Sequence, residues 1–398
     1  MSIALATRMV RTTDPRLLWK FGYNFGFKGM RSVQRFKKRL EKGQVFPPFL
    51  YLSIINSCNL RCTGCWVDVA APRAKLSFEE LDKLVTSAKA HGNAFFGILG
   101  GEPFLHPDLI RLLDAHRDCY FQIFTNGHFI DDAMARELRR VGNATPLISL
   151  EGNAEESDAR RKRSDVYAKT LAGLEACRRH KLITGVATSV CRTNFAHVVT
   201  DAWVDELIRL GVHYAWFHTY RAVGPDSAPE LALTRDELRS VRRFVVETRN
   251  TKPIAFVDAY WDDEGRALCP AATGISHHIS PWGDVEPCPI VQFANEKIGD
   301  HGGDIFKTLT ESRLLADFRK TAAGATRGCI VLERPDLLKD IVTRNGAHDT
   351  TARKTAMGEL EAMRPLPSQY DPGHEVPEKH WVYRFAKKHW FFGFGAYT

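Results

Sequence analysis

The chain has 398 residues, enough for one large domain with a smaller one attached. A hydrophobic fraction of 44% and a charged fraction of 26% are those of an ordinary soluble protein, and no run reaches the roughly 18 apolar residues of a membrane-spanning helix. The N-terminus lacks the apolar stretch of a secretion signal. Nine cysteines, three of them in one motif, indicate a reducing cytoplasm.

Residues 1–46 form a basic arm that is rich in aromatic residues. Residues 1–43 carry eleven Lys and Arg against two acidic residues, so this segment accounts for the net charge of +8. A basic helix is expected at 31–40, after an aromatic stretch that contains Trp19, Phe21, Tyr23, Phe25 and Phe27. This composition suits an anionic membrane surface, a nucleic acid or an acidic peptide. We expect either a peripheral contact with the inner membrane face or an arm that packs across the rest of the fold.

Residues 47–250 alternate short apolar runs with amphipathic stretches, which is typical of parallel strands joined by helices. Strands are expected at 49–56, 94–99, 120–125, 146–151, 185–190 and 214–218. Helices are expected at 77–91, 107–116, 131–141, 167–180 and 197–210, and a further one at 234–250. Six such units predict an α/β fold, a partial (βα)6 TIM-like barrel that binds its ligands at the C-terminal ends of the strands.

A cysteine triplet follows the first expected strand. Cys58, Cys62 and Cys65 form a CxxxCxxC motif. Soft thiolates suit iron–sulfur clusters, and three of them hold three irons of a [4Fe–4S] cube. Because no fourth cysteine lies nearby, one iron would stay open for a substrate or cofactor. A structural zinc site would need a second pair of ligands at a fixed spacing, and the nearest histidines downstream, His91 and His106, do not provide it.

Polar residues follow four further expected strands. The second strand leads into a GGEP turn, in which two glycines permit close backbone approach. The fourth strand ends with Ser149 and Glu151, which alternate onto the same face. The candidate binding residues at these strand ends are Gly100, Gly101, Glu102, Pro103, Asn126, Ser149, Glu151, Arg161, Thr188 and Asn194.

These motifs resemble those of the radical SAM superfamily, whose signature is CxxxCxxC after the first strand of a partial barrel. The resemblance implies that the open iron binds the amine and carboxylate of S-adenosylmethionine (SAM). One electron from the cluster then yields methionine and a 5′-deoxyadenosyl radical. It also implies that the GGEP turn receives the methionine amine, that Ser149 and Glu151 bond the ribose, and that Arg161 pairs with the methionine carboxylate. Asn126, Thr188 and Asn194 would then lie around the same ligand.

The sequence departs from the family pattern beside the third cysteine. The commonest version has an aromatic residue directly before it, whereas this chain has Gly64 there and Trp66 directly after the cysteine. Trp66 is therefore the candidate for the missing aromatic contact to adenine. The resemblance further implies an external electron donor of the flavodoxin or ferredoxin type.

Residues 251–335 are expected to form a small C-terminal extension. Cys269 and Cys288 enclose a predicted hairpin at 275–279 and 284–287, and Cys329 follows. The pattern resembles the first half of a SPASM/Twitch extension and implies one auxiliary [4Fe–4S] cluster on these three cysteines. The alternative is that the thiols are buried as small apolar groups. We assign that packing role to the other cysteines, Cys119, Cys177 and Cys191.

Residues 336–398 are expected to contain a proline-rich linker and a second aromatic and basic segment at 380–392. The leading hypothesis is a radical SAM enzyme that abstracts hydrogen from an unactivated carbon. The aromatic and basic termini favour a lipid-like or other membrane-associated substrate, whereas the extension favours a ribosomally made peptide or protein. A non-catalytic iron–sulfur protein would leave the GGEP turn unexplained, and nucleic acid is a less favoured partner. No catalytic side chain and no oligomeric state is assigned.

Overall fold

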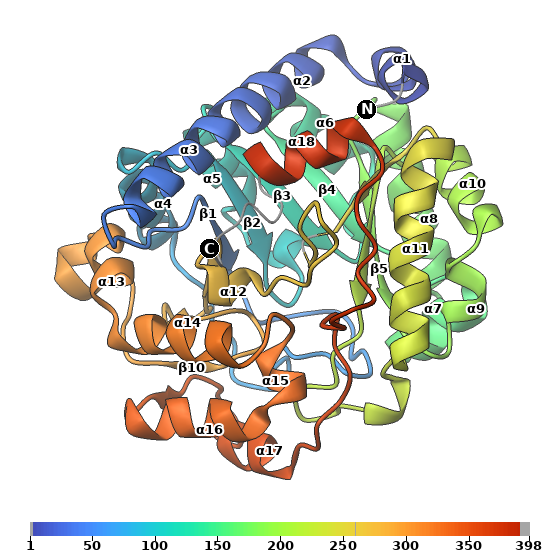
Figure 1. Cartoon of the computed structure of the whole chain (residues 1–398). Helices are drawn as coiled ribbons and strands as arrows, with labels where there is room; N and C mark the ends of the chain where they lie inside the picture. Colours follow the sequence, from blue (N-terminus) through green and yellow to red (C-terminus); the bar gives the residue numbers. More distant parts are fainter. Residues whose placement is uncertain (1–2, 259, 391–398) are drawn as a thin grey trace.

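The computed structural model describes residues 3–258 and 260–390 (Figure 1). Within these residues, nine strands form one sheet in the order β7-β6-β5-β4-β3-β2-β1-β8-β9. The central strands, all parallel, are β1 (Phe49–Ser53), β2 (Phe95–Leu99), β3 (Tyr120–Thr125), β4 (Ala144–Ser149), β5 (Gly185–Val190) and β6 (Tyr214–Thr219). The predicted α/β partial barrel is confirmed.

Helices connect successive strands and cover the outside of the sheet (Figure 1). They are α4 (Phe78–Ala90), α5 (Leu109–Ala115), α6 (Asp132–Val141), α7 (Ala154–Arg161), α8 (Val166–Arg179), α9 (Phe195–Val198) and α10 (Asp201–Arg209). A capping box starts α4: the Ser77 hydroxyl accepts from the Glu80 backbone amide, and the Glu80 carboxylate accepts from the Ser77 backbone amide.

The fourth strand begins two residues earlier than expected. The predicted strand at 146–151 has Pro146 as its first residue, a position that suits a residue without a backbone donor. In the structure it is the third residue of β4 and lies opposite Ile123 of β3. The strand also ends two residues earlier than predicted, at Ser149, and Glu151 lies in the loop that follows.

The C-terminal extension joins the barrel sheet directly. After α11 (Arg235–Thr251) and β7 (Ala255–Val257), strand β8 (Ser276–Ile279) pairs in parallel with β1, Leu50 lying opposite His277. Strand β9 (Val285–Glu286) runs antiparallel to β8, which confirms the predicted hairpin.

The extension has a hydrophobic core of its own, built around Leu314, Phe318, Ile330 and Ile341. The helices of this region are α12 (Pro270–Thr273), α13 (Ile305–Glu311), α14 (Arg313–Ala325), α15 (Ile330–Glu333), α16 (Pro335–Arg344) and α17 (Ala356–Ala362). Short strands β10 (Phe293–Ala294) and β11 (His348–Asp349) pair with each other.

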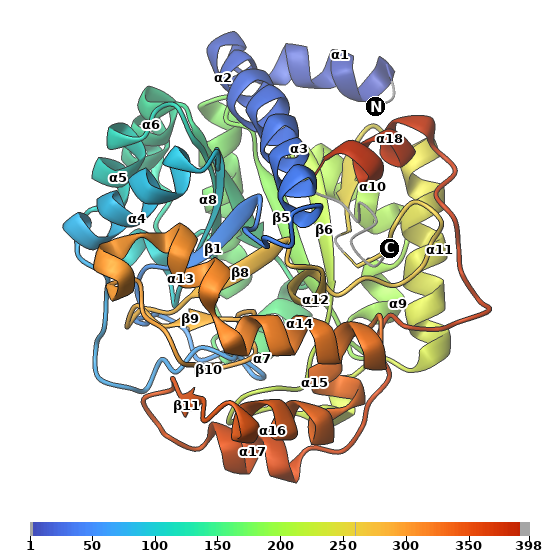
Figure 2. The same ribbon diagram turned by 60° about the vertical axis from the view of Figure 1, so that its left-hand side comes forward.

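The basic arm lies across the ends of the barrel helices (Figure 2). It consists of α1 (Ile3–Thr12), α2 (Pro15–Lys20), a π-helical stretch (Phe21–Phe27) and α3 (Lys28–Leu40). Its polar side chains donate to backbone carbonyls at or just beyond the C-terminal ends of successive helices. Arg8 reaches Val212 after α10 (2.6 Å), Lys20 reaches Val141 of α6 (2.6 Å), Lys28 reaches Asp118 after α5 (2.6 Å) and Arg39 reaches His91 after α4 (2.8 Å).

These contacts explain much of the charge of the arm. Helix C-termini expose unpaired carbonyls and carry partial negative charge, so cations are stabilising there. In a βα unit the helix runs opposite to the strand, and its C-terminal end therefore lies at the edge of the sheet where the strands begin. The arm packs across the barrel at that edge, whereas Cys58, Cys62 and Cys65 follow the opposite edge.

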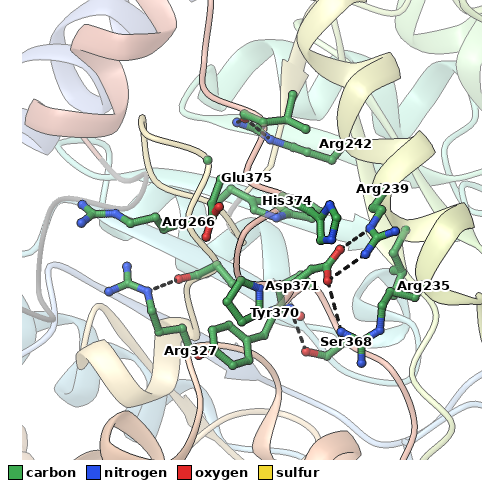
Figure 3. Close-up of a pocket in the computed structure, with 17 residues that line it drawn as sticks. Arg235, Arg239, Arg242, Arg266, Arg327, Ser368, Tyr370, Asp371, His374 and Glu375 are labelled. Atoms are coloured by element: carbon green, nitrogen blue, oxygen red, sulfur yellow. Dashed lines mark hydrogen bonds and ion pairs between the residues drawn. The ribbon is translucent and has the colours of Figure 1, made fainter.

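The C-terminal segment crosses back over α11 to α18 (Trp381–His389), which packs beside α3 (Figure 1). Asp371 anchors it by ion pairs with Arg235 and Arg239 of α11 (Figure 3). The arginine-rich cavity there, about 160 Å³, holds side chains that are already paired with protein groups, and we assign it to anchoring this segment.

A buried ionic cluster completes the attachment of the C-terminal segment. Asp258 accepts from Arg242 (2.7 Å), Arg249 (2.9 Å) and Lys387 (2.5 Å), and Glu378 pairs with Arg249. All five side chains are almost completely inaccessible to solvent. The predicted aromatic tail residues Phe391 and Phe392 lie outside the described residues. Among the helices described, none is both long and apolar enough to cross a membrane.

Candidate SAM and iron–sulfur site

One cavity of about 340 Å³ lies at the C-terminal ends of the barrel strands. Gly64 and Trp66, which flank Cys65, line it on one side. Cys269, Cys288 and Cys329 of the extension line it as well. The predicted cluster loop and the predicted auxiliary cysteines therefore border the same space.

The CxxxCxxC loop is fastened to the helix that follows β4. The Thr63 amide donates to the Arg160 carbonyl (2.9 Å), and the Arg160 guanidinium donates to the Thr63 carbonyl (2.7 Å). The Leu60 amide points at the Cys58 sulfur (3.4 Å), a contact that favours a thiolate. Burial, together with the neighbouring Cys62, raises the pKa of Cys58 to about 11 and that of Cys65 to about 12. Because ligand thiols must lose their protons, metal binding would reverse these shifts.

Arg161 is the buried cation beside this loop. Its guanidinium donates to Glu151 Oε1 (2.6 Å), while its Nε atom has no partner among the described residues. Burial alone would lower the pKa of Arg161, but Cys62 and Glu151 beside it raise the pKa above its usual value. Arg163 instead pairs with Asp165 at the surface. The structure thus places Arg161, with a free donor, next to the cysteine loop, as the resemblance implies for a residue that binds a carboxylate.

The GGEP turn packs tightly on the segment that precedes Cys58. A Cβ atom at Gly100 would lie 2.4 Å from the Ile55 carbonyl, and one at Gly101 would lie 2.3 Å from the Ser57 carbonyl, so only glycine fits. The Glu102 carboxylate does not face the cavity. It is fully buried and accepts from the Thr125 hydroxyl (2.7 Å), the Asn126 amide (2.8 Å) and the Phe104 amide (3.2 Å). Pro103 starts a buried turn of 3-10 helix.

Ser149 and Glu151 both line the cavity, as their alternation predicted. The carboxylate of Glu151 also accepts from the Ser189 amide (3.0 Å), which fixes its orientation. The prediction that Thr188 lies at the ligand is wrong. Its buried hydroxyl donates to the Leu150 carbonyl, and Ser189 lines the cavity instead, because adjacent strand residues point to opposite faces of the sheet.

Asn126 and Asn194 hold loops rather than face open space. The side-chain amide of Asn126 donates to the side-chain oxygen of Asn59 in the cysteine loop (2.8 Å). The Asn194 amide donates to the Glu151 carbonyl (2.8 Å), and both asparagines are buried. We therefore describe them, like Glu102, as residues that position the site.

Tyr220 fills the space beside the third cysteine. Gly64 has φ of +67°, and a Cβ atom there would lie 2.1 Å from the Tyr220 hydroxyl. The Arg160 guanidinium stacks on the Tyr220 ring at 4.6 Å. Trp66 packs instead against the core of the extension and lies edge-on to His278 at 5.5 Å. Trp66 is thus engaged with the extension, and the aromatic side chain next to Gly64 is Tyr220.

The three extension cysteines converge around Arg221. Burial and the neighbouring Cys329 raise the pKa of Cys269 to about 11, and burial with both other thiols raises that of Cys288. Arg221 is half-buried at the cavity wall, donates to the Tyr260 hydroxyl (3.1 Å) and is hydrogen-bonded to Cys329. A cation among three thiols favours their ionised, metal-binding form. In the part of the chain that is described, no group of three His, Cys, Asp or Glu side chains is set to hold a single metal ion. A cube of four irons needs a wider ring of ligands than one ion.

Sequence reasoning missed the aromatic wall of the cavity. Three strands contribute to it, β1 with Tyr51, β3 with Phe124, and β6 with Trp216 and His218, and Tyr260 lines it from the loop after β7. The ring of His218 stacks on Trp216 at 4.7 Å and accepts a hydrogen bond from Tyr260 (2.8 Å). Burial and the charge of Arg221 lower the pKa of His218 to about 3, so it is neutral. The signal was available, because barrel-facing residues alternate along each strand.

Comparison with known proteins agrees with this geometry. Residues 52–215 match the family described as the radical SAM superfamily. This segment is a radical SAM domain. It contains all three cysteines of the triplet, the GGEP turn and the Ser149–Glu151 pair, so the resemblance to the radical SAM superfamily is confirmed for residues 52–215, a segment that this chain shares with enzymes.

The radical SAM domain is similar to several characterised proteins. The Fe-coproporphyrin III synthase of Methanosarcina barkeri is 28% identical over 37% of this chain and 38% of its own length. The PqqA peptide cyclase of Streptomyces rochei is 24% identical over 61% of this chain and 69% of its own length. The chain spans only 38% and 45% of the first two curated relatives. Among solved structures, SuiB of Streptococcus suis bound to S-adenosylmethionine covers 76% of this chain and 74% of its own, with a TM-score of 0.62 and 18% identity.

Proposed function

We propose that this protein is a radical SAM maturase of a ribosomally made peptide or protein. The observation that carries the proposal is the single cavity bordered by the CxxxCxxC loop and by three extension cysteines. In the proposal Cys58, Cys62 and Cys65 hold a [4Fe–4S] cluster that binds SAM. Cys269, Cys288 and Cys329 hold one auxiliary [4Fe–4S] cluster in a SPASM/Twitch-like extension.

The residues around the first cluster are suited to the two ends of SAM. Arg161 offers an unpartnered Nε donor for a carboxylate beside the cysteine loop. Ser149 offers a hydroxyl and Glu151 a carboxylate for hydroxyl groups of a ribose. The backbone of Gly100 and Gly101, free of side chains, would receive the methionine amine. Pro103, Glu102, Asn126, Thr188 and Asn194 fix the loops that carry these groups.

The bound cluster and SAM would supply a 5′-deoxyadenosyl radical when a donor of the flavodoxin or ferredoxin type delivers one electron. The chain places the reacting carbon and keeps water out. Aromatic side chains, with Tyr51, Phe124 and Trp216 among them, form the wall suited to that task. We assign no acid or base role to any side chain.

A peptide is favoured over a lipid by the position of the termini. The lipid hypothesis rested on the aromatic and basic composition of the termini. The arm packs at the edge of the sheet where the strands begin, and the cavity lies at the opposite edge, so the arm gives no support for a lipid in the cavity. SuiB has been solved bound to the precursor peptide SuiA, and anSMEcpe with AdoMet and a peptide, and both resemble this chain in fold.

The proposal is tested with protein reconstituted anaerobically and supplied with dithionite and SAM. The substrates compared are synthetic peptides encoded by short reading frames beside the gene and a total lipid extract from the same cells. We expect 5′-deoxyadenosine formation to rise with one peptide, which also changes in mass. Stimulation by the lipid extract alone would contradict the peptide proposal. The matched control is the Cys58→Ser/Cys62→Ser/Cys65→Ser variant, which should form no 5′-deoxyadenosine.

A further inference from the structure

Exposed apolar side chains are concentrated on the terminal helices. Of eight large hydrophobic side chains exposed among the described residues, only Leu105 lies elsewhere. Globular proteins rarely gather such residues in one region without a partner. The seven on the terminal helices are Ile3, Val10, Trp19, Tyr23, Phe27, Trp381 and Phe385.

Three of them form a ladder along the arm. The rings of Trp19 and Tyr23 stack with centroids 6.0 Å apart, and those of Tyr23 and Phe27 stack at 5.8 Å. They are exposed by 71%, 44% and 46%. Phe21 and Phe25 on the other face already pack on Tyr120 of the barrel. The arm therefore has one aromatic face for the barrel and a second that no described residue covers.

The C-terminal helix extends the same surface. Helix α18 packs beside α3, where Lys37 Nζ donates to the Lys388 carbonyl (2.8 Å) and Trp390 Nε1 donates to the Phe25 carbonyl (3.3 Å) (Figure 2). Trp381 and Phe385, one helical turn apart on α18, are exposed by 74% and 49%. The arm and α18 thus both present exposed aromatic side chains.

The surface around the ladder is positively charged. Residues 15–40 carry eight Lys and Arg and no acidic residue. Several of these cations bond helix ends, but Arg31, Arg35 and Lys38 are exposed. The Arg31 guanidinium lies 5.8 Å from the Phe27 ring, and Lys28 lies 5.3 Å from the Tyr23 ring. Aromatic rings beside cations on a helix that lies flat are the combination that binds an anionic lipid interface.

We propose that the arm and α18 dock this protein on an anionic phospholipid surface. The aromatic ladder would enter the headgroup region, and the exposed cations would contact the lipid phosphates. Because the arm covers the edge where the strands begin, the cavity would then open away from the bilayer. This proposal is independent of the proposed function, since it concerns the opposite end of the barrel.

The test is flotation of the full chain with vesicles of phosphatidylcholine, alone or with about 30% phosphatidylglycerol. We expect the protein to float with the anionic vesicles and not with the neutral ones. The Trp19→Ser/Tyr23→Ser/Phe27→Ser variant should bind about tenfold more weakly, because it loses the apolar contact. Leu105→Ser, which removes the exposed apolar side chain outside the terminal helices, should bind like the parent.

An Arg31→Gln/Arg35→Gln variant should weaken binding to the anionic vesicles and leave the thermal unfolding midpoint unchanged. The same midpoint in the ladder variant would show that it is folded. A parent protein that stays at the bottom of the gradient would overturn the proposal, as would a ladder variant that binds as well as the parent. Binding of single-stranded RNA in place of vesicles, lost in the same variant, would also overturn it and identify a nucleic-acid surface.

Discussion

The Glu102 carboxylate accepts a hydrogen bond of 2.8 Å from the backbone amide of Asn126 and thereby connects the loop after β2 to the loop after β3. The Thr125 hydroxyl donates to the same carboxylate. Asn126 in turn donates to Asn59 inside the cysteine loop. The acidic residue of the GGEP turn is thus connected to the cluster loop through two hydrogen bonds of Asn126, one from its backbone and one from its side chain. Burial raises its pKa to about 7, although these donors oppose the shift.

The raised pKa of Glu102 predicts a pH-dependent stability. The folded state keeps the proton up to about pH 7, whereas the unfolded chain loses it near pH 4.5. The contribution is therefore fully present below pH 4.5 and is lost as the pH rises to 7, by on the order of 3 kcal/mol. Urea unfolding of the parent and of Glu102→Gln should show the advantage of the parent shrinking over this range. The exposed carboxylate of Glu79 provides the control variant Glu79→Gln, which keeps the buried Glu102 and should follow the pH dependence of the parent.

The two cysteine groups predict the iron content. Reconstituted parent should hold about eight irons, and replacing either group of three cysteines by serine should leave about four. Cys191→Ala removes a buried thiol that contacts Thr193 and should retain the full content. Iron and sulfide analysis measures this. If the Cys269→Ser/Cys288→Ser/Cys329→Ser variant kept all the iron of the parent, the auxiliary cluster would be ruled out.

The contact between Gly64 and Tyr220 predicts a steric effect. Gly64→Ala adds a Cβ at positive φ and against the Tyr220 ring, and should destabilise the protein by about 1–3 kcal/mol. Adding Tyr220→Ala should remove the steric part of that cost and leave the backbone part. Gly358→Ala, within helix α17 where nothing lies within 4 Å, should be neutral or stabilising. Thermal unfolding of the parent, the three variants named and the single Tyr220→Ala variant tests this, and an equal cost of Gly64→Ala with and without the Tyr220 side chain would contradict it.

The buried ionic cluster predicts unequal effects for its members. Three cations, Arg242, Arg249 and Lys387, face two anions, Asp258 and Glu378. Glu378→Gln removes one of the two anions and should lower the free energy of unfolding by about 3–5 kcal/mol, because the buried cations lose a neutralising negative charge. Lys387→Met removes the excess cation, whose pKa burial lowers to about 8, and should cost much less. The exposed Lys379→Met is the control. If urea unfolding showed that Lys387→Met and Glu378→Gln lower the free energy of unfolding equally, this account would be contradicted.

The predicted strands matched the structure closely where apolar runs are short and bounded by turn residues. Four of the six strands fall within the predicted ranges. Strand β6 ends one residue later than predicted, at Thr219, and β4 begins and ends two residues earlier, with Pro146 as its third residue. Proline has no backbone N–H to donate to a neighbouring strand, and the local sequence does not show whether the neighbouring strand needs that donor.

The candidate site was predicted less completely than the fold. Cys58, Cys62 and Cys65 could be located from spacing alone, since a triplet within eight residues must be close in space. The roles of Glu102 and Thr188 could not, because the face to which a loop or strand side chain turns depends on the packing of neighbouring strands. The partnership of Gly64 with Tyr220 joins residues 156 positions apart. No local pattern contains such information.

The position of the arm also lay beyond the sequence. Its charge suggested an anionic partner, and much of that charge proved to be directed at the carbonyl ends of barrel helices. The sequence shows how many cations the arm carries. It does not show their acceptors, because these are backbone carbonyls that only the fold brings near the arm.

The central claim is that Cys58, Cys62 and Cys65 hold a cluster with an iron open to SAM. The most direct measurement uses the Cys269→Ser/Cys288→Ser/Cys329→Ser variant, in which only the first cluster remains. Its dithionite-reduced form is examined by electron paramagnetic resonance with and without SAM. The account predicts that SAM changes the g values of the reduced cluster. A cluster verified by iron analysis and reduction, with a spectrum that SAM leaves unchanged, would contradict it.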